Sequence, residues 1–316
     1  MFSHGTKTQP TRHATRAASA RLAPRLLLAL ALVLALVPAT RGAELRFKVG
    51  DTQRRAILVN EAPAGQARPA VLVLHGGAGN ADMQRQRTGF DAIALREGFT
   101  VVYPEGTEWR AGNHAWNTGY LLRRKIGTVD DIGYLDALID LLVKEHRADP
   151  SRIYMTGGSN GAMMTFVYGA RRPEKLAAIA PVVGAMFAFD QKPAVSLPIL
   201  MINGAKDDEV PITGGMSRNP MVRAGQTAPY KPLEETVAFW VAANRSQSKP
   251  VVEVRDTYTT RTYAATAGGA VTISIIDSEG GHGWPGTQSR RDGTAPIQSF
   301  NGSEKVWAFF KSISRP

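Results

Sequence analysis

The sequence predicts an α/β fold in which a mostly parallel central sheet is flanked by helices. Apolar runs of strand length alternate along the chain with segments that repeat with the period of a helix. The run VLVLH at residues 71–75 is nearly unbroken, which is typical of a strand buried on both faces. No repeat, low-complexity linker or charge block follows Glu44. We therefore expect residues 44–316 to form a single domain.

The first half of this domain is expected to contain strands at residues 55–60, 70–75 and 99–103, with a helix over residues 81–97. Its clearest helix begins at Asp130 or Asp131. Carboxylates suit the start of a helix, and the apolar residues between Ile132 and Leu142 recur on one helical face.

The second half begins with a strand at residues 151–156 that leads directly into the glycine-rich stretch GGSNG. The helix expected at residues 163–170 ends before Pro173. Further strands are expected at residues 176–183, 198–202 and 271–276, and further helices at residues 234–244 and 302–313.

Residues 1–43 are predicted to be a secretory signal peptide. Basic residues precede an apolar run at residues 26–37, and small residues follow at Ala39, Gly42 and Ala43. The apolar run is too short to cross a bilayer comfortably, so no stable membrane anchor is expected. Cleavage is expected between residues 39 and 43, and the mature protein is expected to be extracellular or periplasmic.

Composition excludes several classes of function. The formal charge is +11, but the leader holds six basic and no acidic residues, which leaves a mildly basic +5 and no motif for nucleic acid. The chain has no Cys, so it has no disulfide, and its histidines are too scattered for a paired metal motif. A dinucleotide loop would need glycine where the sequence has Asp82. We expect no metal and no cofactor. The oligomeric state is left open.

The stretch GGSNG at residues 157–161 matches G-x-S-x-G, with an expected strand before it and a helix after it. That context is the one required for a nucleophile elbow, a tight turn that presents a serine hydroxyl. A serine needs a base to accept its proton and an acid to orient the base. In this architecture the acid and then the histidine follow the serine along the chain.

His282 is the one histidine that follows Ser159 in the sequence, and it lies in a glycine-rich loop after an expected strand. Asp207 and Asp208 both follow the strand at residues 198–202; we favour Asp207 as the acid. The oxyanion donors are expected to be the backbone N–H of Asn160 and one from the loop His75–Gly76–Gly77.

These motifs together resemble the secreted esterases of the polyhydroxybutyrate depolymerase-like and feruloyl-esterase family, which poly(aspartic acid) hydrolases also resemble. The resemblance is carried by LHGGAGN, VDDIGYLDALID, DPSRIYMTGGSNGAMM, NGAKDDEVPITGG and GGHGWPG. It implies an α/β-hydrolase fold and a serine hydrolase that cleaves carboxylic esters, those of hydroxyalkanoate polyesters or oligomers or related acyl substrates, through an acyl-enzyme. By the same likeness Ser159 is the nucleophile, Asp207 the acid and His282 the base, with Gly77 and Asn160 as oxyanion donors.

The sequence also departs from the family. Asn203 stands where relatives commonly have a histidine, and Gly283 stands where a hydroxyl residue is usual. Full polymer-degrading members carry a separate polymer-binding domain, and we expect none here.

Three segments are expected to surround the site: residues 109–129, 212–231 and 285–301. They hold nine basic residues and one acidic residue, so we expect a basic rim that attracts anionic acyl substrates, small or polymeric. Trp116 and Trp284 are candidates for the pocket wall or for packing. The alternatives are a poly(aspartic acid) hydrolase, a feruloyl or acetyl-xylan type of esterase, and a catalytically silent binding protein. The candidate substrate-binding residues are Trp116, Trp284, Arg123, Arg124, Lys206 and Arg290.

Overall fold

The computed structural model describes residues 42–187, 191–287 and 296–315. From Gly42 onward these residues belong to one compact unit. Most of the predicted signal peptide lies outside the described residues. Within the described ranges, no helix combines the length and the apolar character needed to cross a membrane.

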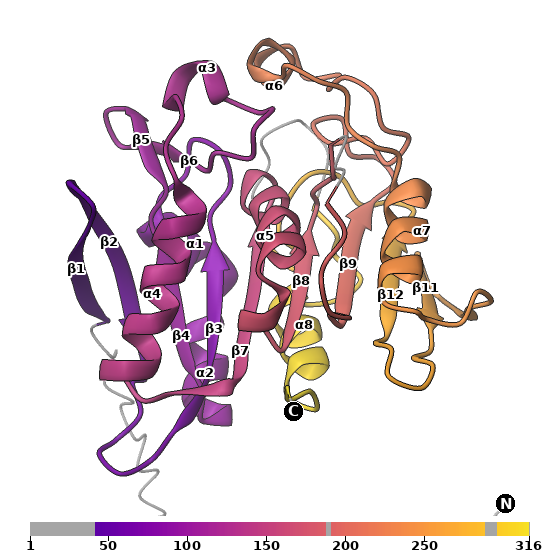
Figure 1. The fold of residues 1–316 in the computed structure, drawn as a ribbon. Helices are drawn as coiled ribbons and strands as arrows, with labels where there is room; N and C mark the ends of the chain where they lie inside the picture. Colours follow the sequence, from indigo (N-terminus) through magenta and orange to yellow (C-terminus); the bar gives the residue numbers. More distant parts are fainter. Residues whose placement is uncertain (1–41, 188–190, 288–295, 316) are drawn as a thin grey trace, which may run out of the picture. The chain divides into compact units, whose positions relative to one another are not determined.

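A ten-stranded sheet forms the centre of the unit (Figure 1), with the strand order β1-β2-β4-β3-β7-β8-β9-β12-β11-β10. Neighbouring strands from β4 to β12 in this order pair in parallel, whereas both edges are antiparallel. The parallel strands are β4 (Thr100–Pro104), β3 (Arg68–Leu74), β7 (Ala148–Gly158), β8 (Ala178–Val182), β9 (Ile199–Gly204) and β12 (Thr272–Asp277). The edge strands are β1 (Ala43–Val49), β2 (Thr52–Val59), β11 (Tyr258–Tyr263) and β10 (Val251–Arg255).

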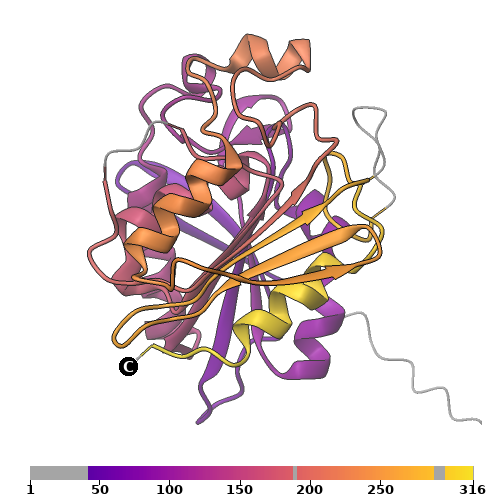
Figure 2. The same cartoon turned by 90° about the vertical axis from the view of Figure 1, so that its right-hand side faces the viewer.

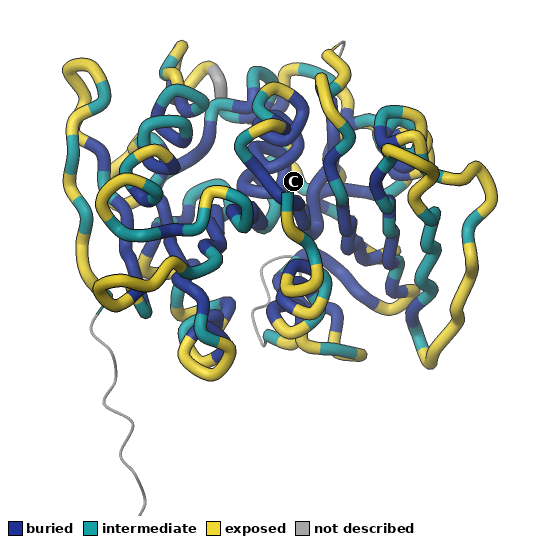
Figure 3. Tube along the Cα trace, turned by 60° about the horizontal axis from the view of Figure 1, so that its bottom comes forward, coloured by how far each residue is buried: buried dark blue, intermediate teal, exposed yellow. Residues whose placement is uncertain are grey.

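Helices cover both faces of the sheet (Figure 2). Side chains alternate along β3: Leu72 and Leu74 pack in one apolar cluster, and Val71 and Val73 pack in the other. The first cluster includes residues of α4 (Asp131–Glu145), α5 (Asn160–Arg171) and α7 (Leu233–Ala243); the second includes residues of α1 (Ala81–Thr88), α2 (Phe90–Glu97) and α8 (Gly302–Phe310). The predicted α/β layering is therefore confirmed. Strands β4, β8 and β9 are buried at every position, and dark blue segments run through the centre of Figure 3.

Two connections extend beyond the carboxyl ends of the parallel strands and meet there. The first carries β5 (Thr107–Arg110), β6 (Asn113–Ala115) and α3 (Arg123–Ile126), and the second carries α6 (Pro220–Gly225) (Figure 1). An isolated bridge pairs Leu121 with Gln226, and the Leu122 N–H donates to the Gly225 carbonyl at 2.9 Å. We call residues 116–130 and 208–231 the paired cover.

The observed elements differ from the predicted ones at several positions. The helix predicted over residues 81–97 is two helices, because Gly89 adopts a left-handed conformation with φ 64° and ends α1. A short 3₁₀ helix, η1 (Pro173–Lys175), precedes β8. Strands β1, β10 and β11 were not predicted. β10 is exposed at every position, so it carries no alternation of apolar and polar residues.

Candidate active site

Ser159 lies at the sharp turn between β7 and α5, with φ 56° and ψ −120°. This region is unfavourable for a residue with a side chain and is held only when neighbouring structure enforces it. Here the Ser159 N–H donates to the Val182 carbonyl at 3.0 Å, and its own carbonyl accepts from Met163 at 2.9 Å. Strand β8 and the first turn of α5 therefore hold the serine in the conformation of a nucleophile elbow.

Two glycines of the motif are required because neighbouring backbone passes too close for a side chain. A Cβ at Gly161 would lie 2.5 Å from the carbonyl oxygens of His75 and Leu74. A Cβ at Gly157 would lie 2.7 Å from the carbonyl carbon of Gly161. The intervening Gly158 is different, because a Cβ there would meet only the Trp284 ring, at 3.6 Å.

The loop after β9 brings Asp207 to His282, which lies in the loop after β12. The Asp207 Oδ2 is 2.8 Å from the His282 Nδ1. The Asp207 Oδ1 accepts the backbone N–H groups of Glu209 and Val210, at 2.9 and 2.8 Å. Both side chains are buried. The carboxylate is thus fixed by its own loop and presents one oxygen to the imidazole.

Lys206 and Asp208, on either side of Asp207, are turned away from His282. The exposed carboxylate of Asp208 accepts from the Arg218 guanidinium at 3.0 Å. Lys206 is exposed and forms an ion pair with Glu279. The structure therefore brings Asp207 and not Asp208 to His282, and it pairs Lys206 with an acid outside the cavity described below.

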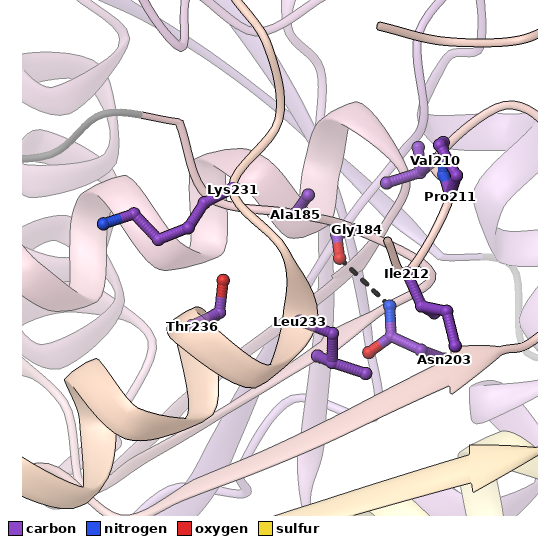
Figure 4. A pocket seen from close by; sticks show the side chains of 9 residues that line it. All are labelled: Gly184, Ala185, Asn203, Val210, Pro211, Ile212, Lys231, Leu233 and Thr236. Carbon is purple, nitrogen blue, oxygen red and sulfur yellow. Dashed lines mark hydrogen bonds between the residues drawn. The ribbon is translucent and has the colours of Figure 1, made fainter. Parts of the chain in front are cut away.

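Asn203, the residue that departs from the family pattern, supports the base of the same loop. Its amide nitrogen donates to the Gly184 carbonyl at 3.1 Å (Figure 4). A small cavity of about 10 Å³ lies beside this bond and is lined in part by Val210, Leu233 and Thr236. Asn203 thus ties the end of β9 to the segment after β8.

Gly77 and Asn160, the expected oxyanion donors, lie side by side. A Cβ added to Gly77 would be 3.7 Å from the Asn160 Cβ, and both residues line one cavity with Ser159. The buried Asn160 amide exchanges two hydrogen bonds with the backbone of Trp116, at 2.7 and 3.1 Å. These bonds connect the start of α5 to the first segment of the paired cover.

Trp116 is fully buried, so it has the packing position that was one of its two predicted roles. Its indole N–H donates to the His75 carbonyl at 2.9 Å, and its ring stacks on Tyr134. Because Trp116 also contacts Asn160 through its backbone, one residue bonds both Asn160 and His75, the residue that begins the predicted oxyanion loop.

The buried His75 ring is required to be neutral by its hydrogen bonds. The Gly106 N–H donates to Nε2 at 2.9 Å, so Nε2 is an acceptor and Nδ1 carries the hydrogen that is donated to the Gly76 carbonyl at 2.8 Å. Burial lowers the pKa of His75 to about 4, and the nearby His114 adds to this effect. The ring thereby connects the oxyanion loop to the segment after β4.

A cavity of about 510 Å³ lies over Ser159 and His282. Both segments of the paired cover contribute apolar walls, through Leu121, Leu122 and Val222. Trp284 lines the inner side, and its indole donates to Ser303 at 2.9 Å. Val183 lines the cavity as well, with a strained φ of 45° that is rare for a β-branched residue.

The charged residues of this cavity differ in part from those predicted. Arg110 and Lys125 belong to the predicted rim, and the Lys125 ammonium lies 4.3 Å from the centre of the Trp109 ring. Sequence reasoning missed Arg87 and Glu209. Arg87 lies within α1 and not after a strand. Glu209 directly follows Asp207 and Asp208, the two acids considered in this loop. No feature of the sequence distinguishes Glu209 from these two acids, because the turn of the loop around Asp207 decides its position.

The other predicted substrate-binding residues either do not line this cavity or lie outside the described residues. Arg124 is exposed in α3 and is not among the described residues that line the cavity. Arg290 lies outside the described residues, and so does the side chain of Arg123. Within the described ranges, no group of three or more His, Cys, Asp or Glu residues is arranged to hold a metal ion.

Comparison with known sequences gives one family and several relatives. The family described as esterase PHB depolymerase matches residues 55–222. NocK of Nocardia uniformis subsp. tsuyamanensis, named for an inferred esterase activity, is 30% identical over 250 residues, which cover 73% of this chain and 71% of NocK. Poly(3-hydroxyalkanoate) depolymerase C of Paucimonas lemoignei is 31% identical over 122 residues, covering 38% of this chain and 28% of that enzyme.

A third relative is the bifunctional acetylxylan esterase/xylanase XynS20E of Neocallimastix patriciarum, 31% identical over 140 residues. The match covers 44% of this chain and only 19% of XynS20E. Among solved structures, an acetyl xylan esterase from Aspergillus awamori superposes with a TM-score of 0.59 at 17% identity, covering 85% of this chain and 99% of that one. Esterase PE8 gives 0.51 at 20% identity, covering 81% and 97%. These neighbours confirm the α/β-hydrolase fold.

Proposed function

We propose, from the premise that this chain belongs to the esterase PHB depolymerase family and hydrolyses carboxylic esters, that the reaction proceeds through Ser159, His282 and Asp207. Family membership favours an enzyme over the catalytically silent binding protein. The geometry that carries the proposal is the strained Ser159 in one cavity with His282, whose Nδ1 lies 2.8 Å from Asp207.

In the proposed reaction the Ser159 Oγ attacks the acyl carbon while its proton passes to the His282 Nε2. The carbonyl π electrons move to the oxygen, where the N–H groups of Gly77 and Asn160 stabilise the negative charge. The imidazolium then protonates the leaving alcohol as the carbon–oxygen bond breaks. Water hydrolyses the acyl-enzyme by the same proton transfers, and Asp207 stabilises the charged ring throughout without accepting a proton.

Replacing Ser159 tests this mechanism. We expect Ser159→Ala to lower kcat for a nitrophenyl ester by about a thousandfold or more, because no nucleophile remains. The variant should also resist labelling by a fluorophosphonate. Ser151→Ala, at the opposite end of β7, is a matched control that should retain both activity and labelling. Hydrolysis by Ser159→Ala at the wild-type rate would refute the mechanism.

We propose that the substrate is an anionic acyl ester. The proposal is supported by Arg87, Arg110 and Lys125, which line the cavity against a single acid, Glu209, among the described lining residues. Exposed cations act mainly by attracting anionic substrates toward the site before they bind, and salt screens this long-range attraction. We therefore expect kcat/KM for an anionic ester to fall with ionic strength more steeply than kcat/KM for its neutral analogue.

Lys125→Gln should reduce this difference in salt response, whereas Lys144→Gln, on α4, should leave it unchanged. Equal salt responses for the two esters would refute an anionic preference.

A substrate panel distinguishes the candidates: hydroxybutyrate oligomers, methyl ferulate, acetylated xylan and poly(aspartic acid). Cleavage of poly(aspartic acid) would show that the enzyme hydrolyses amide bonds.

We also propose that the mature protein begins between residues 39 and 43 and is secreted. Ala43 is the first residue of β1 and pairs with Leu58, so cleavage after Ala39 would leave β1 complete. Amino-terminal sequencing of protein recovered from the periplasm and from the medium tests both the cleavage site and the compartment. A full-length protein retained in the cytoplasm would refute the proposal.

A further inference from the structure

A second carboxylate lies beside the histidine of the proposed site. The Glu209 Oε2 is 3.3 Å from the His282 Nε2, on the opposite side of the ring from Asp207. The Glu209 side chain is only 10% exposed, and it lines the same cavity as Ser159. Nε2 is the nitrogen that exchanges the proton in the proposed reaction, so this carboxylate lies at a chemically sensitive atom.

Glu209 is held in place by hydrogen bonds with Asp207 and Asn219. Its backbone N–H donates to the Asp207 Oδ1 at 2.9 Å. The Asn219 amide approaches the Glu209 Oε1 at 3.5 Å, and the same Asn219 caps α6 by accepting from Met221 at 3.0 Å. The carboxylate is therefore oriented toward His282 by contacts on two sides.

The carboxylates next to the ring favour its protonated form. A neutral ring that donates from Nδ1 to Asp207 would direct the lone pair of Nε2 toward the Glu209 oxygen, whereas an imidazolium offers an N–H to each acid. The cations of the cavity oppose this effect: Arg87 from α1, Arg110 from β5 and Lys125 from α3.

Tyr230 also lies near both acids, but it contributes no charge. Burial raises the pKa of its hydroxyl, and Asp207 and Glu209 raise it further. Glu209 is the acid in contact with Nε2, so its effect on the ring is the largest among the described groups on that side.

We infer that Glu209 is a positioning residue of the hydrolase that stabilises the imidazolium form of His282, and that it thereby raises both the maximal rate and the pH at which that rate is reached. The inference depends on the proposed function. In each half-reaction His282 accepts a proton from Ser159 or from water and returns it to the leaving group. Glu209 is not a partner in either proton transfer.

The test is the pH profile of kcat/KM for Glu209→Gln. Loss of the charge lowers the proton affinity of the resting ring and, by the same factor, the stability of the transition state that contains the imidazolium. We expect the alkaline plateau to fall about tenfold and the acidic midpoint to move about one pH unit lower. Because the two effects are equal, the acidic limbs of variant and wild type should superpose.

A merely structural role predicts a different result: the plateau falls, but the midpoint stays, so the acidic limbs separate by the same factor. That result would overturn the inference. Asp208→Asn removes one negative charge from the same loop without removing a contact to His282, and its midpoint should stay at the wild-type value. If Glu209→Gln does not fold, Glu209→Asp should move the midpoint in the same direction by a smaller amount.

Fluorophosphonate inactivation separates this inference from the proposed function. The rate of inactivation should follow the same pH shift, because it requires only Ser159 and its base. If Ser159→Ala still hydrolyses ester, the proposed function fails. If Ser159→Ala is inactive and the Glu209→Gln midpoint is unmoved in both assays, the function stands and only the role of Glu209 is wrong.

Discussion

Acidification is expected to destabilise this fold through His75. The ring is fully buried and neutral, because Nε2 accepts the Gly106 N–H and Nδ1 donates to the Gly76 carbonyl. Protonation would place an N–H against the N–H of Gly106. Burial accordingly lowers the pKa of His75 from 6.5 to about 4.

The sign and size of the effect follow from this shift. The unfolded chain takes up a proton below its pKa of 6.5, whereas the folded protein does so only near 4. Stability is therefore complete above the first value and falls as the pH decreases toward the second. Between pH values of about 7 and 4.5 the expected loss from this ring is about 2.5 kcal/mol.

Urea denaturation at a series of pH values measures this loss, with His75→Gln as the comparison. The glutamine variant lacks the titrating ring, so the difference in unfolding free energy between wild type and variant should shrink by about 2.5 kcal/mol over the same range. Contributions from other titrating groups cancel in that difference. His146→Gln, at the end of α4, is the matched control. A wild-type to His75→Gln difference that stays constant within about 0.5 kcal/mol would refute the reasoning.

Two further predictions concern the contacts around the proposed nucleophile. Trp116→Phe removes the hydrogen bond to the His75 carbonyl. Steady-state kinetics should then show a kcat about tenfold lower, with little change in KM. The control Trp307→Phe, which loses an indole hydrogen bond to Glu97, should retain kcat. Gly161→Ala places a Cβ 2.5 Å from two carbonyl oxygens and should cost about 3 kcal/mol or more in denaturation, whereas Gly158→Ala, with its nearest contact at 3.6 Å, should melt within a few degrees of wild type.

Much of the fold was predictable because parallel strands are buried on both faces and leave continuous apolar runs. β3 and β4 are examples, since all or nearly all of their residues are buried. Prediction failed where a strand is exposed to solvent or where the conformation of a single residue ends a helix. β10 is exposed throughout, and the break between α1 and α2 depends on the left-handed Gly89, which the apolar pattern does not reveal.

The candidate site likewise contains residues that the sequence could select and residues that it could not. Ser159 and His282 each follow a strand end, so chain order and topology were enough to select them. Topology left both Asp207 and Asp208 as candidates for the acid, and the likeness to the family favoured Asp207. Glu209 could not be selected, because its position depends on how one loop turns around Asp207. The role of Trp116 could not be decided from the sequence, because the sequence does not distinguish a tryptophan that packs in the core from one that lines a pocket. Their contacts alone distinguish these roles.

The backbone bridge between Leu121 and Gln226 limits how this enzyme can be remodelled. The two segments that it joins are about a hundred residues apart in the chain, yet each supplies the other's hydrogen-bond partner, at Leu122 with Gly225 and at Thr227 with Tyr120. A chimaera that imports one of these segments from a relative would leave backbone groups of the other without partners. Specificity should therefore be transferable between relatives only when both segments are grafted together.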